Sequence, residues 1–238
     1  MNRNEGNVIR SWLKVILVVA LTGILTHFLP FSSFFRNVDT LVHELSHALA
    51  TLALSGKVNV IHLYWDQSGV TQSSFPSNWM AIPISLAGYI GSALFALLLF
   101  ALYAKRYERA GLIVVTVLAA IAVVLFVRNG YGIIWCVGFA AVSALVAYLA
   151  PPWLRNGYYM LIAFICLVES VVSPFIILFA SLYNPSSAGD AANLAQATHV
   201  PALIWCLVFA AISLLCAKVS TSLLFKRGFG KEQKTLAQ

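Results

Sequence analysis

Charged residues are scarce in this chain of 238 residues, since Asp, Glu, Lys and Arg make up only 10% of it while 61% is hydrophobic. The mean hydropathy is +0.87. A soluble domain of this length has no use for so much apolar surface, so the composition argues against a water-soluble enzyme and predicts a polytopic membrane protein. Because lipid cannot satisfy free backbone groups, each long apolar run is expected to be a helix.

Cysteine is also rare. The four cysteines are Cys136, Cys166, Cys206 and Cys216, and each lies within an apolar run. Their spacing fits neither a zinc knuckle nor a disulfide framework, so we interpret them as small core residues. No basic patch is interleaved with aromatic residues, which argues against nucleic-acid binding. Without repeats or low-complexity segments, one integral membrane domain is expected over residues 1–218, with a basic tail at 219–238.

Seven apolar runs have lengths that suit bilayer spans. They are residues 11–29, 39–55, 79–104, 111–127, 130–150, 157–182 and 200–218. Pro30, Pro151-Pro152 and Asn184-Pro185 punctuate them. The first run lacks a small-residue cleavage site and is followed by more spans, so we expect an anchor there rather than a signal sequence. The predicted fold class is an all-α polytopic integral membrane protein with about six to seven transmembrane helices.

Positive charge gathers near both ends of the chain and in "KRYER", residues 105–109. Basic ends suit an anionic cytoplasmic leaflet, and we expect a bacterial-type cytoplasmic membrane. The positive-inside rule then requires an even number of crossings. Seven runs are an odd number, so either one run does not cross or one basic end lies outside; the sequence leaves both alternatives open.

Two segments break the apolar pattern. Residues 56–74, "GKVNVIHLYWDQSGVTQSS", alternate loosely and are rich in β-branched and aromatic residues, which predicts a β-hairpin with Gly69 near its turn. Residues 183–201 are small and polar, and Ser186, Ser187 or Asp190 is available to cap a short helix that ends before Pro201.

The chemistry centres on "HELSH", residues 43–47. On a helix His43 and His47 lie on one face a turn apart, so both imidazoles can reach one zinc ion. Glu44 points toward the same region and can accept a proton from an activated water without being a ligand. The alternative is a polar network between helices, although ionisable groups within spans are usually functional.

A catalytic zinc site needs a third protein ligand. The candidates are Asp39, Asp66, Asp190, Glu169, His27, His62 and His199. Asp39, one turn before His43, is better placed as a helix N-cap or as a partner of that imidazole. Asp66 suits the hairpin turn and His62 a structural strand position. Glu169 remains open as a ligand, a proton relay or a partner of Arg128 or Arg155, and Asp190 as a ligand or an N-cap.

A family resemblance extends over residues 38–218. "LVHELSHALATLALSGKV", a hairpin ending in "SGVT", then "AGYIGSALFALLL" and "GDAANLAQATHVPALIW" resemble the M50B-like membrane peptidases, relatives of the site-2 proteases. The resemblance implies an intramembrane zinc metalloprotease whose third ligand is a distant aspartate, here Asp190. The site-2 proteases usually carry that aspartate before glycine and after asparagine and proline. Asn184 and Pro185 are present, but Ala191 follows the aspartate.

The expected activity is zinc-dependent hydrolysis of peptide bonds in membrane-embedded substrates. Zn²⁺ is held by His43, His47 and Asp190, and Glu44 serves as the general base and acid. Partners are then a membrane protein or peptide substrate and the lipid bilayer, while the oligomeric state stays open. The alternatives are a non-catalytic zinc-binding scaffold, against which the intact Glu44 argues, and an ion-coupled transporter that uses Glu44, Glu169 and Asp190 as relay groups. No inverted repeat supports a transporter.

Two further expectations concern packing and substrate. Gly88, Gly91, Ser92 and Ala93 form a small-residue face that permits close approach of another helix, and we expect that helix to carry His43 and His47. Small residues also occur at many other helix contacts, so the alternative is that this face packs against a different helix. The hairpin is expected to present an edge strand, which would hold a substrate extended while its amide reaches the metal.

Overall fold

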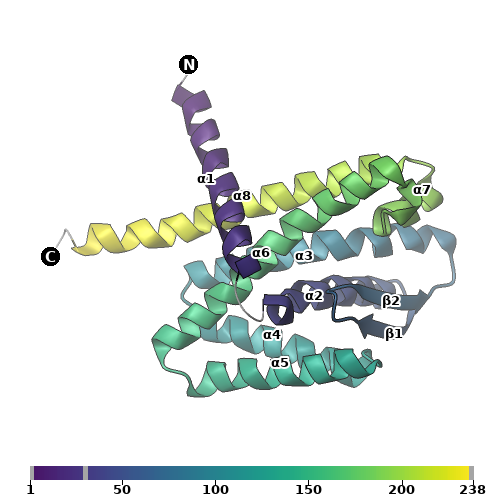
Figure 1. Ribbon diagram of the computed structural model, residues 1–238, viewed down its shortest axis with the longest axis horizontal. Helices are drawn as coiled ribbons and strands as arrows, with labels where there is room; N and C mark the ends of the chain where they lie inside the picture. Colours follow the sequence, from purple (N-terminus) through teal and green to yellow (C-terminus); the bar gives the residue numbers. More distant parts are fainter. Residues whose placement is uncertain (1–2, 29–31, 236–238) are drawn as a thin grey trace.

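The computed structural model describes residues 3–28 and 32–235, so Pro30 lies outside the described residues. The chain folds into long helices with one β-hairpin (Figure 1). The elements are α1 (Arg3–Phe28), α2 (Ser32–Ala53), β1 (Lys57–Leu63), β2 (Gly69–Ser74), α3 (Ala81–Ala104), α4 (Glu108–Leu125), α5 (Gly130–Leu149), α6 (Pro152–Tyr183), α7 (Asp190–Thr198) and α8 (Ala202–Thr235), with single 3₁₀ turns at Asn78–Met80 and Pro185–Ser187. The predicted all-α membrane fold with a hairpin after the "HELSH" helix is confirmed.

Five helices within the described residues are long and apolar enough to cross a membrane, namely α3, α4, α5, α6 and α8. The run at 11–29 corresponds to α1, whose strongly apolar part is shorter, Ser11–Ile24. The run at 39–55 corresponds to α2, which is not among the five because its buried face carries Asn37, Asp39, Glu44 and His47. That helix is polar where a simple span would be apolar.

Prolines and one arginine set several helix ends. Pro152 occupies the first turn of α6, where a missing N–H costs nothing, and Asn184-Pro185 follows the last turn of the same helix. The guanidinium of Arg128 donates to the carbonyl oxygens of Val124 and Leu125, which the end of α4 leaves without helical partners.

The core is built around α3, which packs against α2, α6, α7 and α8. Aromatic side chains fill another part of the core: Trp135 and Phe139 of α5 stack with ring centroids 5.1 Å apart, and both rings lie against Phe34 of α2. Tyr159 of α6 is 1% exposed, and its hydroxyl donates to the Leu99 carbonyl over 2.6 Å, so the buried polar atom is satisfied.

The hairpin has the predicted position, with Gly69 as the first residue of β2. The strands are antiparallel, and Thr71 lies opposite Ile61. The outer edge of β1 is covered, since the Ile61 amide donates to Phe126 and its carbonyl accepts from Arg128. The Ser68 hydroxyl and amide both donate to Asp66 in the exposed turn and hold the pKa of that carboxyl below its usual range.

The second break contains α7, which ends at Thr198. His199 follows in the left-handed conformation, with φ of 60°, ahead of Pro201. Gly189, with φ of 52°, is the residue before the helix, a backbone conformation that a side chain would strain. Asp190 is therefore the first helical residue and not the N-cap, and its carboxylate is turned elsewhere.

Candidate metal centre

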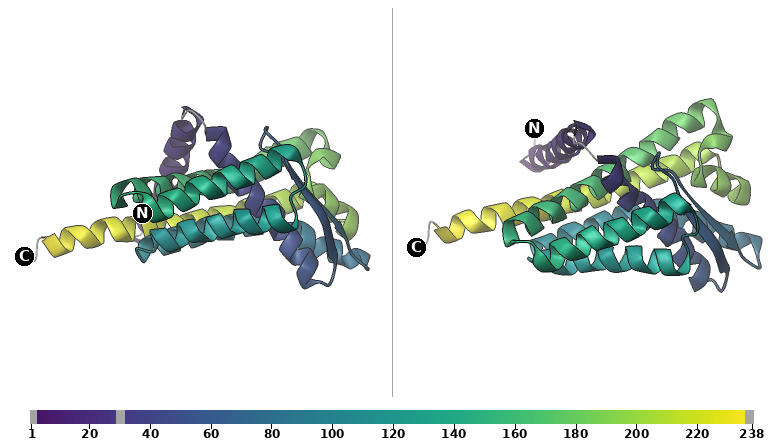
Figure 2. Two further views of the ribbon diagram at one scale, coloured as in Figure 1. Left: turned by 90° about the horizontal axis from the view of Figure 1, so that it is seen from below. Right: turned by 60° about the horizontal axis from the view of Figure 1, so that its bottom comes forward.

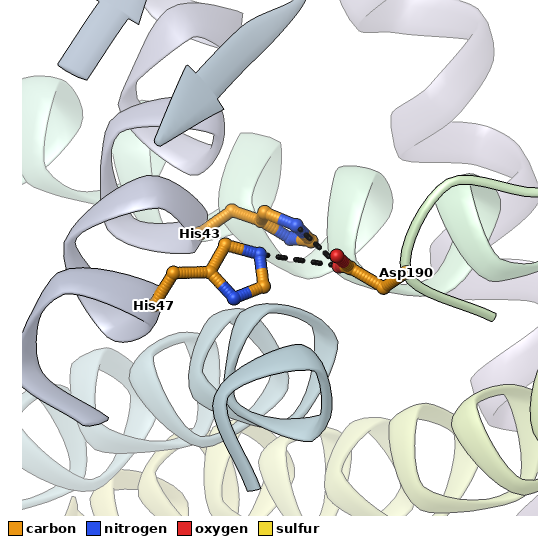
Figure 3. Close-up of side chains that lie close together, drawn as sticks. All are labelled: His43, His47 and Asp190. Carbon is orange, nitrogen blue, oxygen red and sulfur yellow. Dashed lines mark hydrogen bonds and ion pairs between the residues drawn. The ribbon is translucent and has the colours of Figure 1, made fainter. Parts of the chain in front are cut away.

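His43 and His47 project from one face of α2 toward the start of α7 (Figure 3). The Nε2 atoms lie 3.0 Å and 3.1 Å from the same Asp190 oxygen, Oδ2. The three ligand atoms lie within 4.8 Å of one another. Folding thus brings together His43 and Asp190, which are 147 positions apart in the chain. Within the described part of the protein, these three side chains form a cluster that could hold a metal ion.

A hydrogen bond fixes the orientation of one imidazole. His47 Nδ1 lies 2.7 Å from the Ile84 carbonyl oxygen, which can only accept, so Nδ1 carries the proton. In the neutral ring Nε2 then has a lone pair that faces the Asp190 carboxylate. Two acceptors at 3.1 Å repel each other, so the arrangement requires a proton or a metal ion between them.

The donor set fits zinc. Bonds of about 2.1 Å place two ligand atoms of a tetrahedral site about 3.4 Å apart, close to the observed contacts. Two imidazoles and one carboxylate leave a fourth position for water or substrate, as catalytic zinc sites require. His43, His47 and Asp190 would hold the ion.

The small-residue face of α3 packs against the helix that carries the histidines, as expected. A Cβ added to Gly88 would overlap the imidazoles of His43 and His47, and one added to Gly91 would overlap Ser46. Glycine is required at position 88 because the α3 backbone forms one wall of the cluster. The Tyr89 ring meets His43 edge-on, with centroids 4.7 Å apart.

Replacing Gly88 tests this wall. In Gly88→Ala the added methyl group must push α2 from α3 or turn both imidazoles, so zinc affinity should fall by about 10- to 100-fold, as for other supports of metal ligands. Zinc titration of purified protein measures the change. Gly138→Ala is the matched control, since a Cβ there meets nothing within 4 Å. Equal zinc affinity in both variants would mean that α2 and α3 accommodate the added methyl group without disturbing the imidazoles.

Glu44 lies beside the cluster and is held by the hairpin. The Thr71 hydroxyl donates to Glu44 Oε2 over 2.6 Å, and Gly69 sits so close that a Cβ there would contact Glu44 Oε1 at 2.7 Å. Glu44 as a residue is 5% exposed, and it lines the same cleft as the histidines. The sequence motif identified Glu44; Thr71 and Gly69 carry no signal of their own, because their role arises only when β2 docks on α2.

The cluster opens into a cleft of about 1050 Å³. Its walls come from α2, β2, the start of α3 and α7, and they include Val70, Phe75, Trp79, Asn193 and His199. Both polar and apolar groups face the space, which suits a polypeptide segment better than an ion alone.

The remaining ligand candidates lie elsewhere. Glu169 pairs with neither Arg128 nor Arg155, the two partners that the sequence left open, because Arg36 of α2 donates to it through Nε at 2.6 Å. Asp39 is not an N-cap, since α2 begins at Ser32; its Oδ1 is buried without a hydrogen-bond partner among the described residues.

His62 lies on β1, where its Nδ1 is 3.4 Å from the Tyr64 hydroxyl, and Asp66 is exposed in the hairpin turn. His199 lines the cleft but is not part of the three-residue cluster. The side chain of His27 lies outside the described residues.

Comparison with protein families gives a match to the model described as peptidase M50B-like, over residues 8–220. No curated protein and no solved structure matched the chain. The family match covers the "HELSH" helix, the hairpin, α3 and α7, which are the parts that build the cluster and its walls. The chain belongs to the peptidase M50B-like family.

Proposed function

We propose that the protein is a zinc-dependent intramembrane metalloprotease that hydrolyses peptide bonds of membrane-embedded substrates. The observation that carries this proposal is the meeting of His43, His47 and Asp190 in a cleft that Glu44 also lines. A structural site would have no need of a carboxylate held beside the ligands without belonging to them.

The chain supplies the proton chemistry. A zinc ion held by the cluster would supply Lewis acidity, which activates water and polarises the scissile carbonyl. Glu44 takes the proton of the attacking water and later delivers it to the leaving amine. Thr71 keeps the carboxylate oriented through its hydrogen bond to Oε2. Glu44 is buried, so little of it meets bulk water.

The hairpin offers a place for an extended substrate. Ile61 directs its amide and carbonyl away from β2 to residues 126–128, so Thr71 opposite it directs its own away from β1. Gly69 and Ser73 share that direction by the two-residue period of a strand. All three line the cleft, and pairing along this edge would hold a substrate strand beside the cluster.

The test is chelator-sensitive proteolysis by the purified protein in detergent, with fluorescently labelled casein as an unfolded probe. We expect about one zinc per chain and cleavage that ortho-phenanthroline stops, that added zinc restores and that the non-chelating meta-phenanthroline leaves unchanged. Zinc without cleavage would favour a scaffold. Ion flux in proteoliposomes that persists after chelation would favour the transporter alternative and overturn the proposal.

A further inference from the structure

The two ends of the helical bundle differ in charge. One end, here called the metal end, consists of residues 54–80, 126–129 and 184–201, which hold the hairpin and α7. The other, the tail end, consists of residues 105–107, residues 150–151 and the second half of α8. Figure 2 shows the hairpin and α7 at one extreme of the molecule and the C-terminus at the opposite extreme.

The first two helices bring the chain across the bundle once. The Lys14 ammonium lies 5.0 Å from the Phe225 ring centroid and the Lys218 ammonium 4.9 Å from that of Trp12, so α1 lies against residues 218–225 of α8. Figure 1 shows α1 lying across the other helices, and α2 then leads to the hairpin at the metal end. Neither α1 nor α2 is among the five candidate membrane spans found in the described residues.

Six crossings follow, from α1 and α2 together and from each of the five candidate spans. An even number places the two basic ends of the chain on the same side, which resolves the parity that seven separate runs left open.

Basic side chains then gather at the tail end. Within it lie Lys105, Arg106, Lys226 and Arg227. Beside it lie Arg109 and Arg155, in the first turns of α4 and α6, and Lys14 and Lys218, which contact Phe225 and Trp12. Contacts within this end hold some of them in place: Arg109 lies over Tyr148, and Arg227 lies over Tyr103 and pairs with Glu108.

The metal end has little basic character. Of its described residues, Lys57 and Arg128 are the basic ones, and Arg128 is engaged by the carbonyl oxygens at the end of α4. Arg36 lies within the bundle, paired with Glu169. Lys and Arg beside short loops determine orientation, and they stay on the cytoplasmic side. The tail end is therefore the cytoplasmic one.

The cluster lies close to the opposite surface. Gly88, which forms its wall, is seven residues from the start of α3, or about 10 Å at 1.5 Å per residue. The cleft continues to Phe75, Trp79 and His199, which precede α3 or follow α7 at the metal end.

We infer that the metal cleft opens toward the non-cytoplasmic side of the membrane. Its substrates are polypeptide segments presented from that side, either the outer ends of membrane spans or secreted chains that reach the hairpin. This substrate class rests on the proposed proteolytic function, whereas the orientation does not.

Single cysteines and a membrane-impermeant maleimide test the orientation. Trp65→Cys marks the hairpin turn and Tyr107→Cys the tail end; these side chains are 76% and 57% exposed and lie outside the cluster. The wild-type chain gives the background, since its cysteines are buried or partly buried. Both variants should be labelled in detergent, which shows that both positions are reactive.

In right-side-out vesicles Trp65→Cys should be labelled and Tyr107→Cys protected, and inverted vesicles should give the reverse. The opposite pattern, or labelling of both cysteines from one side, would overturn the inference. Casein added to the same vesicles should be cleaved in a chelator-sensitive way only by right-side-out ones, and cleavage only by inverted ones would also overturn it. Correct labelling without cleavage in either would reject the proteolytic function and leave the orientation standing.

Discussion

Glu44→Gln should lower the rate of peptide hydrolysis by about 10²- to 10⁴-fold, the range that a positioned general acid and base contributes. The amide has nearly the same shape as the carboxylate and still accepts the Thr71 hydrogen bond, so the cleft should keep its geometry. An amide cannot take a proton from water near neutral pH. Zinc content should stay at the wild-type value, because Glu44 lies outside the three-residue cluster.

The measurement compares initial rates of casein cleavage and zinc content for Glu44→Gln, the wild type and Asp66→Asn. Asp66 is a matched control because it is an acid of the hairpin that holds Glu44, but it is exposed in the turn and bonded to Ser68 rather than to the cluster. Asp66→Asn should be as active as the wild type. A Glu44→Gln variant that cleaves at the wild-type rate would remove Glu44 from the mechanism.

The sequence predicts the parts of the site whose signal is local. The four-residue spacing of His43 and His47 requires only a helix to place both rings on one face, and α2 is that helix. Likewise the small side chains around Gly88 predict a close helix contact. The turn and strand residues of the hairpin predict the hairpin itself. Each of these depends on residues within a few turns of one another.

Long-range pairings are where sequence reasoning fails. Nothing near Glu169 identifies Arg36 as its partner, since the two lie on α6 and α2, 133 positions apart. Asp190 was similarly ambiguous, because an aspartate before a short helix is usually a cap. Gly189 occupies the N-cap position of α7, so the Asp190 carboxylate is not needed as a cap. The number of spans is obscured for a related reason: hydropathy counts α1 and α2 as two runs, although neither helix is among the five candidate spans of the described residues.

Asp190→Ala should reduce bound zinc from about one per chain to nearly none. The carboxylate is the only charged member of the cluster when both imidazoles are neutral, so its removal leaves two nitrogen donors and no negative charge for a dication. The expected loss of affinity exceeds the roughly 10- to 100-fold that an outer partner of a ligand costs. Elemental analysis of protein purified under metal-replete conditions measures the zinc content, and His47→Ala should show the same loss.

Glu169→Gln is the control for Asp190→Ala. It also alters a half-buried acid of a distant helix, but one whose partner is Arg36 and not an imidazole. We expect this variant to keep its zinc and to unfold more easily, by about 2 kcal/mol for a weakened charged hydrogen bond. If instead Glu169→Gln lost the metal and Asp190→Ala kept it, Glu169 would be the third ligand. Retention of zinc in both, with loss only in His47→Ala, would mean that the third donor lies outside this pair of acids.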